Sequence, residues 1–251
     1  MRLFNLLLGI TTAFATAQAA DHTILAIGAH AGDMENASAA VLAKQKKLGD
    51  RVVILHLTLG EGGNPRKSPD DYGNQKRREA MEAAKTIGAE VIFGPYRDGE
   101  LPNDESARRY VAGVIRQVKP TQVITHWKNS IHRDHSTTYT LVSDALLLAE
   151  LESIDLGHPP WRGVRAVYYT ENWEDPDGFK PYVYVDVTDE LPLWKDCVTK
   201  YEFIRGGISP FPYLDYYEAL ARVRGAEAGK RYAVAFDVDE MSKKQVVDSL
   251  R

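Results

Sequence analysis

Residues 23–35 read TILAIGAHAGDME, and this stretch decides the fold. Its first six residues, Thr23 to Gly28, form an uninterrupted apolar run, which is typical of a strand buried on both faces at the centre of a parallel sheet. A His-x-x-Asp pair follows at once, at His30 and Asp33, before a helical pattern over Glu35 to Leu48. The stretch therefore predicts a β-α unit that carries polar side chains at the carboxyl end of its strand.

The same alternation of short apolar, β-branched runs with helical patterns continues along the chain. Further strands are predicted at 51–57, 90–93, 121–126, 165–169 and 182–186, and further helices at 71–87, 104–118, 134–150, 189–204 and 213–225. No internal repeat or interdomain linker is recognisable. We therefore expect an α/β fold, a Rossmann-like three-layer αβα sandwich with a mostly parallel sheet, as a single domain over residues 21–251.

The first twenty residues are predicted to lie outside this fold. Arg2 precedes an apolar run from Leu3 to Ala15, and residues 17–19 (AQA) resemble a processing site. This is the pattern of a secretory signal peptide over residues 1–20, cleaved near Ala20. No later segment has the roughly 18 to 20 continuous apolar residues of a membrane span. We expect a secreted or periplasmic protein without a transmembrane segment after signal cleavage.

Composition and charge narrow the possible partners. The 251 residues include 31 Lys and Arg and 35 Asp and Glu, which gives a formal net charge of −4. A mildly acidic chain without a basic stripe argues against a nucleic-acid partner. Cys197 is the single cysteine, so no intrachain disulfide can form, and its apolar helical surroundings predict a buried thiol.

A second histidine cluster, HRDH at residues 132–135, follows the strand predicted at 121–126. In a sheet ordered 3-2-1-4, the first and fourth strands flank the switch point, where ligands bind beyond the carboxyl ends of the strands. We therefore expect the two clusters to meet. His30, Asp33 and one histidine of the second cluster supply two imidazoles and a carboxylate, a set that suits zinc or iron(II) with a position left open for water. Asp134 could orient one of the imidazoles.

Two alternatives stay open at this point. A His-x-x-Asp pair after a strand is also a common helix-capping arrangement, because Asp caps helices readily. Two histidines and a carboxylate also suit a non-haem iron oxygenase, although the predicted parallel sheet counts against that class by analogy of fold. The expected meeting of two clusters at one edge of the sheet favours a metal site.

At these residues the chain resembles the LmbE/PIG-L family of zinc-dependent N-acetylglucosaminyl-type deacetylases. The family's His-(Pro/Ala)-Asp-Asp-x-Glu motif resembles residues 30–35, and its His-Pro-Asp-His motif resembles residues 132–135. Weaker matches extend nearly end to end, at Thr58–Gly62, Arg77–Ala80, Ile87-Gly88, Asp98-Gly99, Leu101, Asp186–Thr188, Lys195, Arg224-Gly225, Gly229, Tyr232-Ala233 and Phe236.

The resemblance implies metal ligation by His30, Asp33 and His135, with Zn²⁺ as the ion and Fe²⁺ or another divalent metal as alternatives. It makes His132 the histidine that stabilises the oxyanion or donates a proton, and Asp134 its neighbouring carboxylate. The implied activity is metal-dependent removal of an N-acetyl or similar N-acyl group from an amino sugar or sugar conjugate. The implied partner is therefore a small-molecule or glycan N-acetylated amino-sugar substrate.

One position departs from the family pattern. The family's first Asp, which is taken as the general base, falls on Gly32, and glycine cannot accept a proton. Another carboxylate could serve instead, and Glu35 and Glu61 are near in sequence. Alternatively, hydrolysis proceeds with little base assistance, at a rate lower by about 10²–10⁴. A third reading is a metal- and sugar-binding protein of the same fold that has lost hydrolytic activity.

Three further features bear on the pocket. His126 ends the fourth predicted strand, where it is either a pocket-lining residue or a buried structural one. The polar, Gly/Pro-rich segment Gly60 to Gly73 is either a lid or a surface loop. The aromatic segment Gly206 to Tyr217 suits a pocket wall or a subunit contact.

Overall fold

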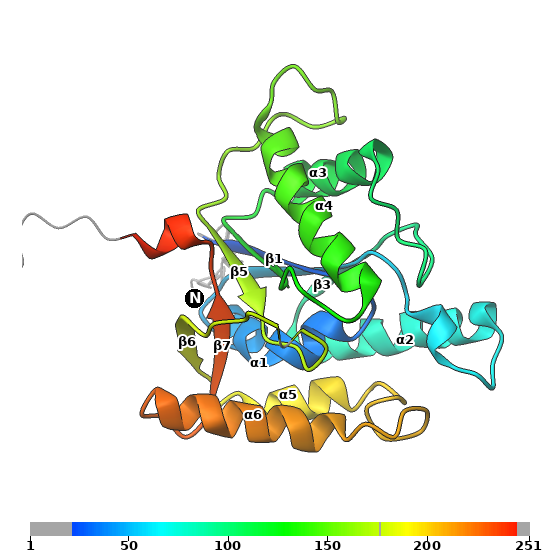
Figure 1. Ribbon diagram of the computed structural model, residues 1–251, viewed down its shortest axis with the longest axis vertical. Helices are drawn as coiled ribbons and strands as arrows, with labels where there is room; N and C mark the ends of the chain where they lie inside the picture. The colour runs from blue at the N-terminus through cyan, green and yellow to red at the C-terminus, as the bar shows by residue number, and fades with distance from the viewer. Residues whose placement is uncertain (1–21, 176, 245–251) are drawn as a thin grey trace, which may run out of the picture.

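Seven strands and six α-helices make up the part of the protein that the computed structural model describes, residues 22–175 and 177–244 (Figure 1). The strands are β1 (Thr23–Gly28), β2 (Arg51–His56), β3 (Glu90–Phe93), β4 (Gln122–His126), β5 (Ala166–Thr170), β6 (Val183–Asp186) and β7 (Ala233–Asp237). The helices are α1 (Asp33–Lys47), α2 (Pro69–Ile87), α3 (Glu105–Val118), α4 (Arg133–Glu150), α5 (Leu191–Val198) and α6 (Tyr213–Glu227). Two short 3₁₀ helices are η1 (Glu61–Gly63) and η2 (Glu240–Lys243).

The strands form one sheet in the order β3-β2-β1-β4-β5-β7-β6. The five strands from β3 to β5 are parallel, whereas β7 pairs antiparallel with both β5 and β6. The chain leaves β1 toward β2 on one side and returns as β4 on the other, so the switch point lies between β1 and β4. The predicted 3-2-1-4 order and mostly parallel sheet are confirmed.

Two elements differ from the sequence prediction. Strand β7 was not predicted, because its five residues, AVAFD, include two alanines and an aspartate, which are uncommon in strands. The helix predicted at 189–204 ends at Val198 in α5. The side chain of Arg205 donates to the main-chain oxygens of Thr199 and Lys200, and these hydrogen bonds hold the chain in turns beyond the end of the helix.

Helices cover both faces of the sheet, which confirms the three-layer sandwich. Alternate residues of each central strand point to opposite faces. Ile24 and Ala26 of β1 pack with α1, α2, α5 and α6, while Leu25 and Ile27 pack with α3 and α4. Figure 1 shows these two groups of helices on opposite sides of the sheet. Because β1 is apolar on both faces, it can lie only at the centre of such a sandwich.

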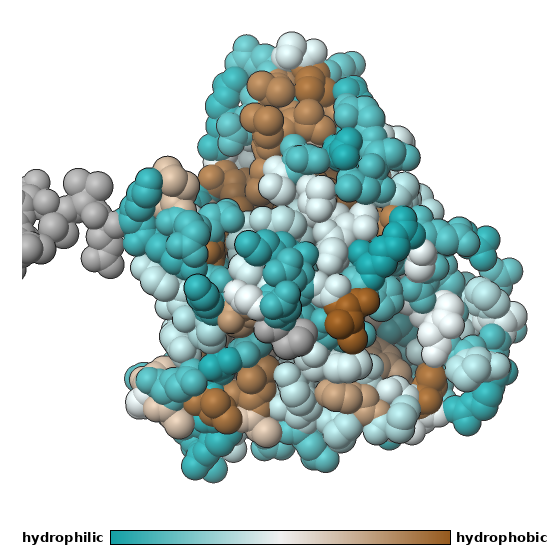
Figure 2. All heavy atoms as spheres, in the orientation of Figure 1, coloured by the Kyte–Doolittle hydropathy of each residue, from teal (hydrophilic) through white to brown (hydrophobic). Residues whose placement is uncertain are grey.

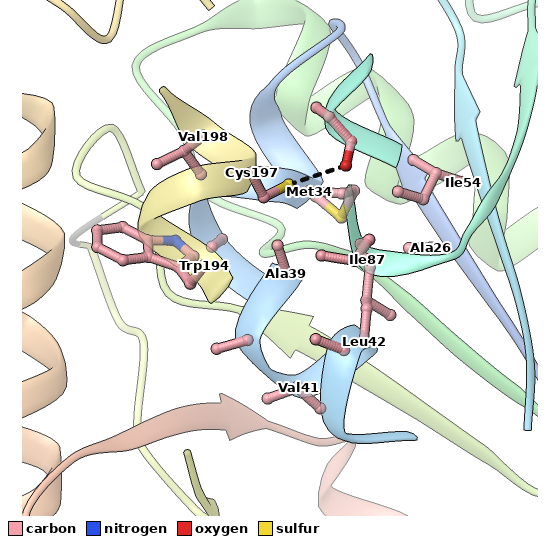
Figure 3. Packing of buried hydrophobic residues seen from close by; sticks show 14 of the residues in the cluster. Ala26, Met34, Ala39, Val41, Leu42, Ile54, Ile87, Trp194, Cys197 and Val198 are labelled. Atoms are coloured by element: carbon pink, nitrogen blue, oxygen red, sulfur yellow. Dashed lines mark hydrogen bonds between the residues drawn. The ribbon is translucent and has the colours of Figure 1, made fainter. Parts of the chain in front are cut away.

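The single cysteine belongs to the first of these packed layers. Figure 3 shows Cys197 of α5 close to Met34 and Ile87, with its thiol directed at a carbonyl oxygen. Its Sγ donates to the main-chain oxygen of Ala83 at 3.3 Å, and the side chain is fully buried. Burial raises the pKa of this thiol, so Cys197 is a packing residue, as predicted from its surroundings.

The helices and the surface of the described residues bear on whether the chain has a membrane-spanning element. Within residues 22–175 and 177–244, no helix is long and apolar enough to cross a membrane. Figure 2 shows a largely hydrophilic face on which apolar surface gathers mainly at the end that α4 occupies in Figure 1. The signal peptide predicted at residues 1–20 lies outside the described residues.

A buried arginine fixes the position of α4, the helix that carries the second histidine cluster. The guanidinium of Arg116, on α3, is 1% exposed and donates to five main-chain oxygens at and beyond the end of α4. These acceptors are Leu148, Ala149, Leu151, Ile154 and His158. Carbonyl groups at a helix carboxyl end lack partners within the helix and carry partial negative charge, so one cation satisfies several at once.

Replacing Arg116 by methionine should lower the free energy of unfolding by about 3–5 kcal/mol, because buried carbonyl groups lose a charged donor. Denaturant unfolding followed by circular dichroism measures this loss. Arg109→Met on the same helix removes an exposed guanidinium with one hydrogen bond to Asp155, and should cost less than about 1 kcal/mol. Equal losses in the two variants would contradict the role assigned to Arg116.

Candidate metal centre

The carboxyl ends of β1 and β4 bring the two histidine clusters together. His30 follows β1, and Asp33 is the first residue of α1. His132 is the N-terminal cap of α4, and His135 lies in its first turn. The rings of His30 and His135 have centroids 5.2 Å apart, and those of His30 and His132 are 4.5 Å apart. Residues about a hundred positions apart in the chain therefore meet at the predicted switch point.

Asp33 lies between the other two predicted ligands. Its Oδ2 is 3.1 Å from Nδ1 of His30 and 3.4 Å from Nε2 of His135. Ligand atoms of a tetrahedral zinc ion, at bond lengths near 2.0–2.1 Å, are about 3.3 Å apart. Each of these two separations therefore fits a pair of ligand atoms on one zinc ion.

His135 is oriented for ligation by a carboxylate on its far side. Its Nδ1 is 3.3 Å from Oδ1 of Asp175, which is fully buried, while its Nε2 faces Asp33. A hydrogen bond from Nδ1 to Asp175 fixes the tautomer whose Nε2 lone pair is free. Burial alone would lower the pKa of His135, but Asp33 and Asp175 outweigh burial and raise that pKa to about 9.

His30 has the same kind of support. Its Nε2 is 3.1 Å from Oδ1 of Asp98 and 3.5 Å from Oδ2 of Asp134, on the side opposite Nδ1. Those carboxylates are fixed in turn, because Asp98 accepts the N–H of Gly62 and Asp134 accepts the N–H of Gly99. The Asp134 side chain, predicted as the neighbour of His132, is fully buried and directed at His30.

Three overlapping groups of side chains in the described part of the chain are close enough to hold an ion. They are His30 with His132 and His135, Asp33 with His126 and His135, and His30 with Asp98 and Asp134. The ligands implied by the family resemblance, His30, Asp33 and His135, do not all occur in one of these groups. His30 belongs to the first group, Asp33 to the second and His135 to both. The geometry therefore does not by itself choose among the sets, and the hydrogen bonds of His126 and His132 have to be considered.

His126 is a buried member of the cluster whose lone pair is already engaged. Its ring stacks on His135 with centroids 4.0 Å apart, and its Nε2 accepts the N–H of Ala29 at 3.0 Å. That hydrogen bond uses the lone pair that a metal ion would need. His126 therefore positions the loop after β1, which answers the question left open by the sequence in favour of a buried structural histidine.

His132 is suited to donate a hydrogen bond into the pocket. Its Nδ1 accepts the N–H of Asp134 at 3.2 Å, so Nε2 carries the hydrogen in the neutral ring. Burial, with help from the positive charge of His30 and His135, lowers the pKa of His132 and favours that neutral form. The ring lines the same pocket as His30 and Asp33.

The pocket above the cluster is open and has a volume of about 240 Å³. Its walls come from the loop after β1, α2, the segment between β5 and β6, and the segment before α6. Ile208, Ser209 and Tyr213 line it, as expected for a wall formed by residues 206–217. The segment at 60–73 is more ordered than expected, since η1 and the start of α2, capped by Ser68, occupy most of it.

Gly32 has a backbone conformation that explains why a side chain is absent there. Its φ is +107°, in the region that favours glycine, and a Cβ would lie 2.9 Å from Cζ of Phe203. Its N–H donates to Oε2 of Glu35. Phe203 therefore occupies the space into which an aspartate at this position would extend.

Neither carboxylate suggested by sequence proximity faces the pocket. Glu35 is fully buried, where Oε1 accepts the Tyr201 hydroxyl at 2.7 Å and is 3.3 Å from Nε2 of His56. Glu61 accepts the N–H of Asp98 and lines a neighbouring hollow of the surface with Arg77. Both glutamates are positioned to support the loops around the site.

Glu174 is the carboxylate that sequence reasoning missed. It lies between β5 and β6, lines the pocket, and its Oε2 is 3.7 Å from Nε2 of His135. Burial raises the pKa of Glu174 above its ordinary value. Its neighbour Asp175, which orients His135, was missed as well. The adjacent acids in WEDPD (173–177) were the available signal, but nothing in a single sequence places that segment beside α4.

Both the sequence and the fold resemble those of known proteins. Residues 25–146 match the sequence model of the PIG-L family, described as GlcNAc-PI de-N-acetylase. The chain carries a PIG-L domain. The resemblance to the LmbE/PIG-L family is thus confirmed, and that match includes β1 to β4, the loop after β1 and the start of α4 with both histidine motifs.

Relatives of this PIG-L domain protein catalyse two kinds of reaction. A curated 4-oxalmesaconate hydratase of Pseudomonas putida is 25% identical over 222 residues, 84% of this chain and 82% of its own. The structure of N,N'-diacetylchitobiose deacetylase from Pyrococcus horikoshii matches with a TM-score of 0.77 at 20% identity, covering 91% of this chain and 88% of the other. The structure of GalB, the 4-carboxy-2-hydroxymuconate hydratase from P. putida, matches with a TM-score of 0.78 at 22% identity, covering 92% of this chain and 100% of the other.

The backbone conformation at Gly32 and the contact with Phe203 predict that an aspartate at this position is destabilising. Gly32→Asp alone should lower the free energy of unfolding by about 1–3 kcal/mol, because of its φ and the contact with Phe203. Adding Phe203→Ala should recover part of that cost by removing the contact. Urea unfolding of Gly32→Asp, Phe203→Ala and the double variant measures the coupling energy between the two positions. Strictly additive effects would show that Phe203 does not fill this space.

Proposed function

We propose that this protein is a metal-dependent hydrolase that removes an N-acetyl or similar N-acyl group from an amino sugar or sugar conjugate, acting outside the cytoplasm. The observation that carries the proposal is the meeting of His30, Asp33 and His135 in a PIG-L domain, at the base of an open pocket. The apparent loss of the family's base at Gly32 is compatible with this activity, because Glu174 lines the same pocket.

His30, Asp33 and His135 would hold the metal, with Zn²⁺ as the ion that this donor set suits best. A bound divalent ion would lower the pKa of a water molecule and polarise the amide carbonyl of the substrate. Asp175 keeps His135 in the ligating tautomer. Asp98 and Asp134 lie beside Nε2 of His30, on the side of the ring away from Asp33.

Two further side chains would handle protons. Glu174, whose carboxylate is next to His135 and whose pKa burial raises, would accept a proton from the attacking water. His132 would donate its Nε2 hydrogen bond to the oxygen that becomes negative as water adds to the carbonyl carbon. When the carbon–nitrogen bond breaks, the leaving amine would take up the proton held by Glu174.

A second candidate is the addition of water to a carbon–carbon double bond of a small organic acid. The curated hydratase that is 25% identical across 84% of this chain favours it. The same groups would serve, since both reactions need an activated water and a proton donor. The products separate the candidates, because only the first reaction releases a carboxylic acid and an amine.

Removal of the metal should abolish acetate release from a panel of N-acetylated sugars, and adding Zn²⁺ back should restore it.

Asp175→Asn should weaken zinc binding by about 10–100-fold, because it disturbs the partner of His135. His135→Ala should bind less zinc still. Competition with a chromogenic chelator measures the affinity, with the exposed His158→Ala as control. Full turnover in metal-free protein would contradict the proposal.

Glu174→Gln should lower kcat by about 10²–10⁴, the usual contribution of a general base, while the bound zinc per chain stays the same. The matched control is Glu152→Gln, an exposed glutamate just beyond the carboxyl end of α4 that is paired with Arg162. Unchanged kcat would remove Glu174 from the mechanism. Loss of stoichiometric zinc would instead make it a ligand and contradict its role as base.

A further inference from the structure

A buried lysine stands in the wall of the pocket. Lys76 lies on α2 and is 4% exposed, yet it lines the pocket together with His30, His132 and Glu174. Lysine is seldom this buried without a charged partner, because removing an ammonium group from water is costly. Its position therefore calls for an explanation that the proposed hydrolysis does not supply.

The contacts of Lys76 are polar and aromatic, without an ion pair. Its Nζ donates to the main-chain oxygen of Ala31 and lies 4.1 Å from the ring centroid of Phe203 and 4.9 Å from that of Tyr201. Among the residues that the structure describes, no carboxylate oxygen comes within 4.0 Å of Nζ. One N–H and a ring face are thus engaged, and the charge itself has no direct counter-ion.

The ammonium form nevertheless persists near neutral pH. Burial lowers the pKa of Lys76 to about 8, and the more distant Asp33 and Glu79 oppose that decrease. Such a buried charge without an ion-pair partner destabilises the folded protein by an amount that an anion in the pocket would offset.

The charge lies where the family pattern places a negative group. Nζ is 3.6 Å from the position that a Cβ on Gly32 would take, and position 32 corresponds to the family's first aspartate. An ammonium group therefore lies at the side of the pocket where the family resemblance places an aspartate. At that wall, the local preference is for anionic ligand groups.

We propose that Lys76 binds a carboxylate of the substrate, so that the pocket selects a carboxylate-bearing compound over a neutral N-acetyl sugar. The inference rests on the proposed function only in taking this pocket as the substrate site. Within the proposed hydrolysis it points to an N-acylated sugar acid or a similar acidic amide. The pairing of an ammonium group with one carboxylate supplies charge recognition, while the neighbouring aromatic rings limit where Nζ can lie.

A structural role and a binding role for Lys76 predict opposite effects of its replacement on the melting temperature. If Lys76 serves to hold Phe203 and Ala31, replacing it by methionine removes a hydrogen bond and a cation–π contact and lowers the melting temperature. If it is a binding residue kept at a cost to stability, the methionine fills the same volume without a buried charge. The melting temperature of Lys76→Met is then equal to or higher than that of the native protein.

Calorimetric titration with succinate and with N-acetylglucosamine tests the proposal without requiring turnover. Native protein should bind succinate at least 10-fold more tightly than the neutral sugar, both zinc-loaded and metal-stripped. Lys76→Met and Lys76→Gln should each weaken succinate binding at least 10-fold and leave sugar binding within twofold. Lys85→Met, an exposed lysine on the same helix, makes the same change in net charge and should bind succinate as the native protein does.

Two results would overturn the proposal. One is native protein that binds succinate no better than the sugar, and the other is Lys76 variants that keep native succinate affinity. The titration of metal-stripped protein measures binding in the pocket without the metal-dependent reaction. The effect of Lys76 on succinate binding can therefore be determined even if the protein proves not to be a hydrolase. Conversely, acetate release from neutral sugars with no succinate binding would support the hydrolase and reject the anionic substrate.

Discussion

The parallel pairing of β1 with β4 is the constraint on which the site depends. This pairing, which the Thr125 hydroxyl reinforces by donating to the main-chain oxygen of Ile27, brings the loop after β1 beside the start of α4. His126, the last residue of β4, then accepts the N–H of Ala29 and fixes that loop. Asp33 is thereby held between two imidazoles. Because β1 is apolar on both faces, it is stable only in the centre of the sheet, between β2 and β4. The same apolar sequence therefore builds the core and brings the two histidine clusters together.

The sequence predicted the central strands, the switch point and the meeting of the two histidine clusters, because these follow from local apolar patterns and one rule of topology. It did not predict Glu174 or Asp175, since the loop that carries them packs against α4 through contacts that no periodicity encodes. It also missed β7, a short strand that is stabilised by pairing with β5 and β6 rather than by its own propensity. The sequence also could not predict the direction of side chains: Asp134, predicted as the neighbour of His132, faces His30 instead.

Charge organisation separates this pocket from the family pattern that it resembles. Five acidic side chains surround the histidines, and each has a proposed task as ligand, orienting partner or proton acceptor. On the other wall, Gly32 and Phe203 leave no room for the usual base, and the ammonium of Lys76 lies beside them. The proposed activation of water thus involves one side of the pocket, and the proposed recognition of a carboxylate involves the other.

The central claim is that one divalent ion binds to His30, Asp33 and His135. A crystal structure of the zinc-loaded protein, with anomalous diffraction recorded at the zinc edge, tests it most directly. The account predicts one zinc ion per chain, bonded to Nδ1 of His30, Oδ2 of Asp33 and Nε2 of His135. An ion held instead by His126 with Asp33 and His135, or by His30 with Asp98 and Asp134, would contradict it. So would the absence of zinc from the fully loaded protein.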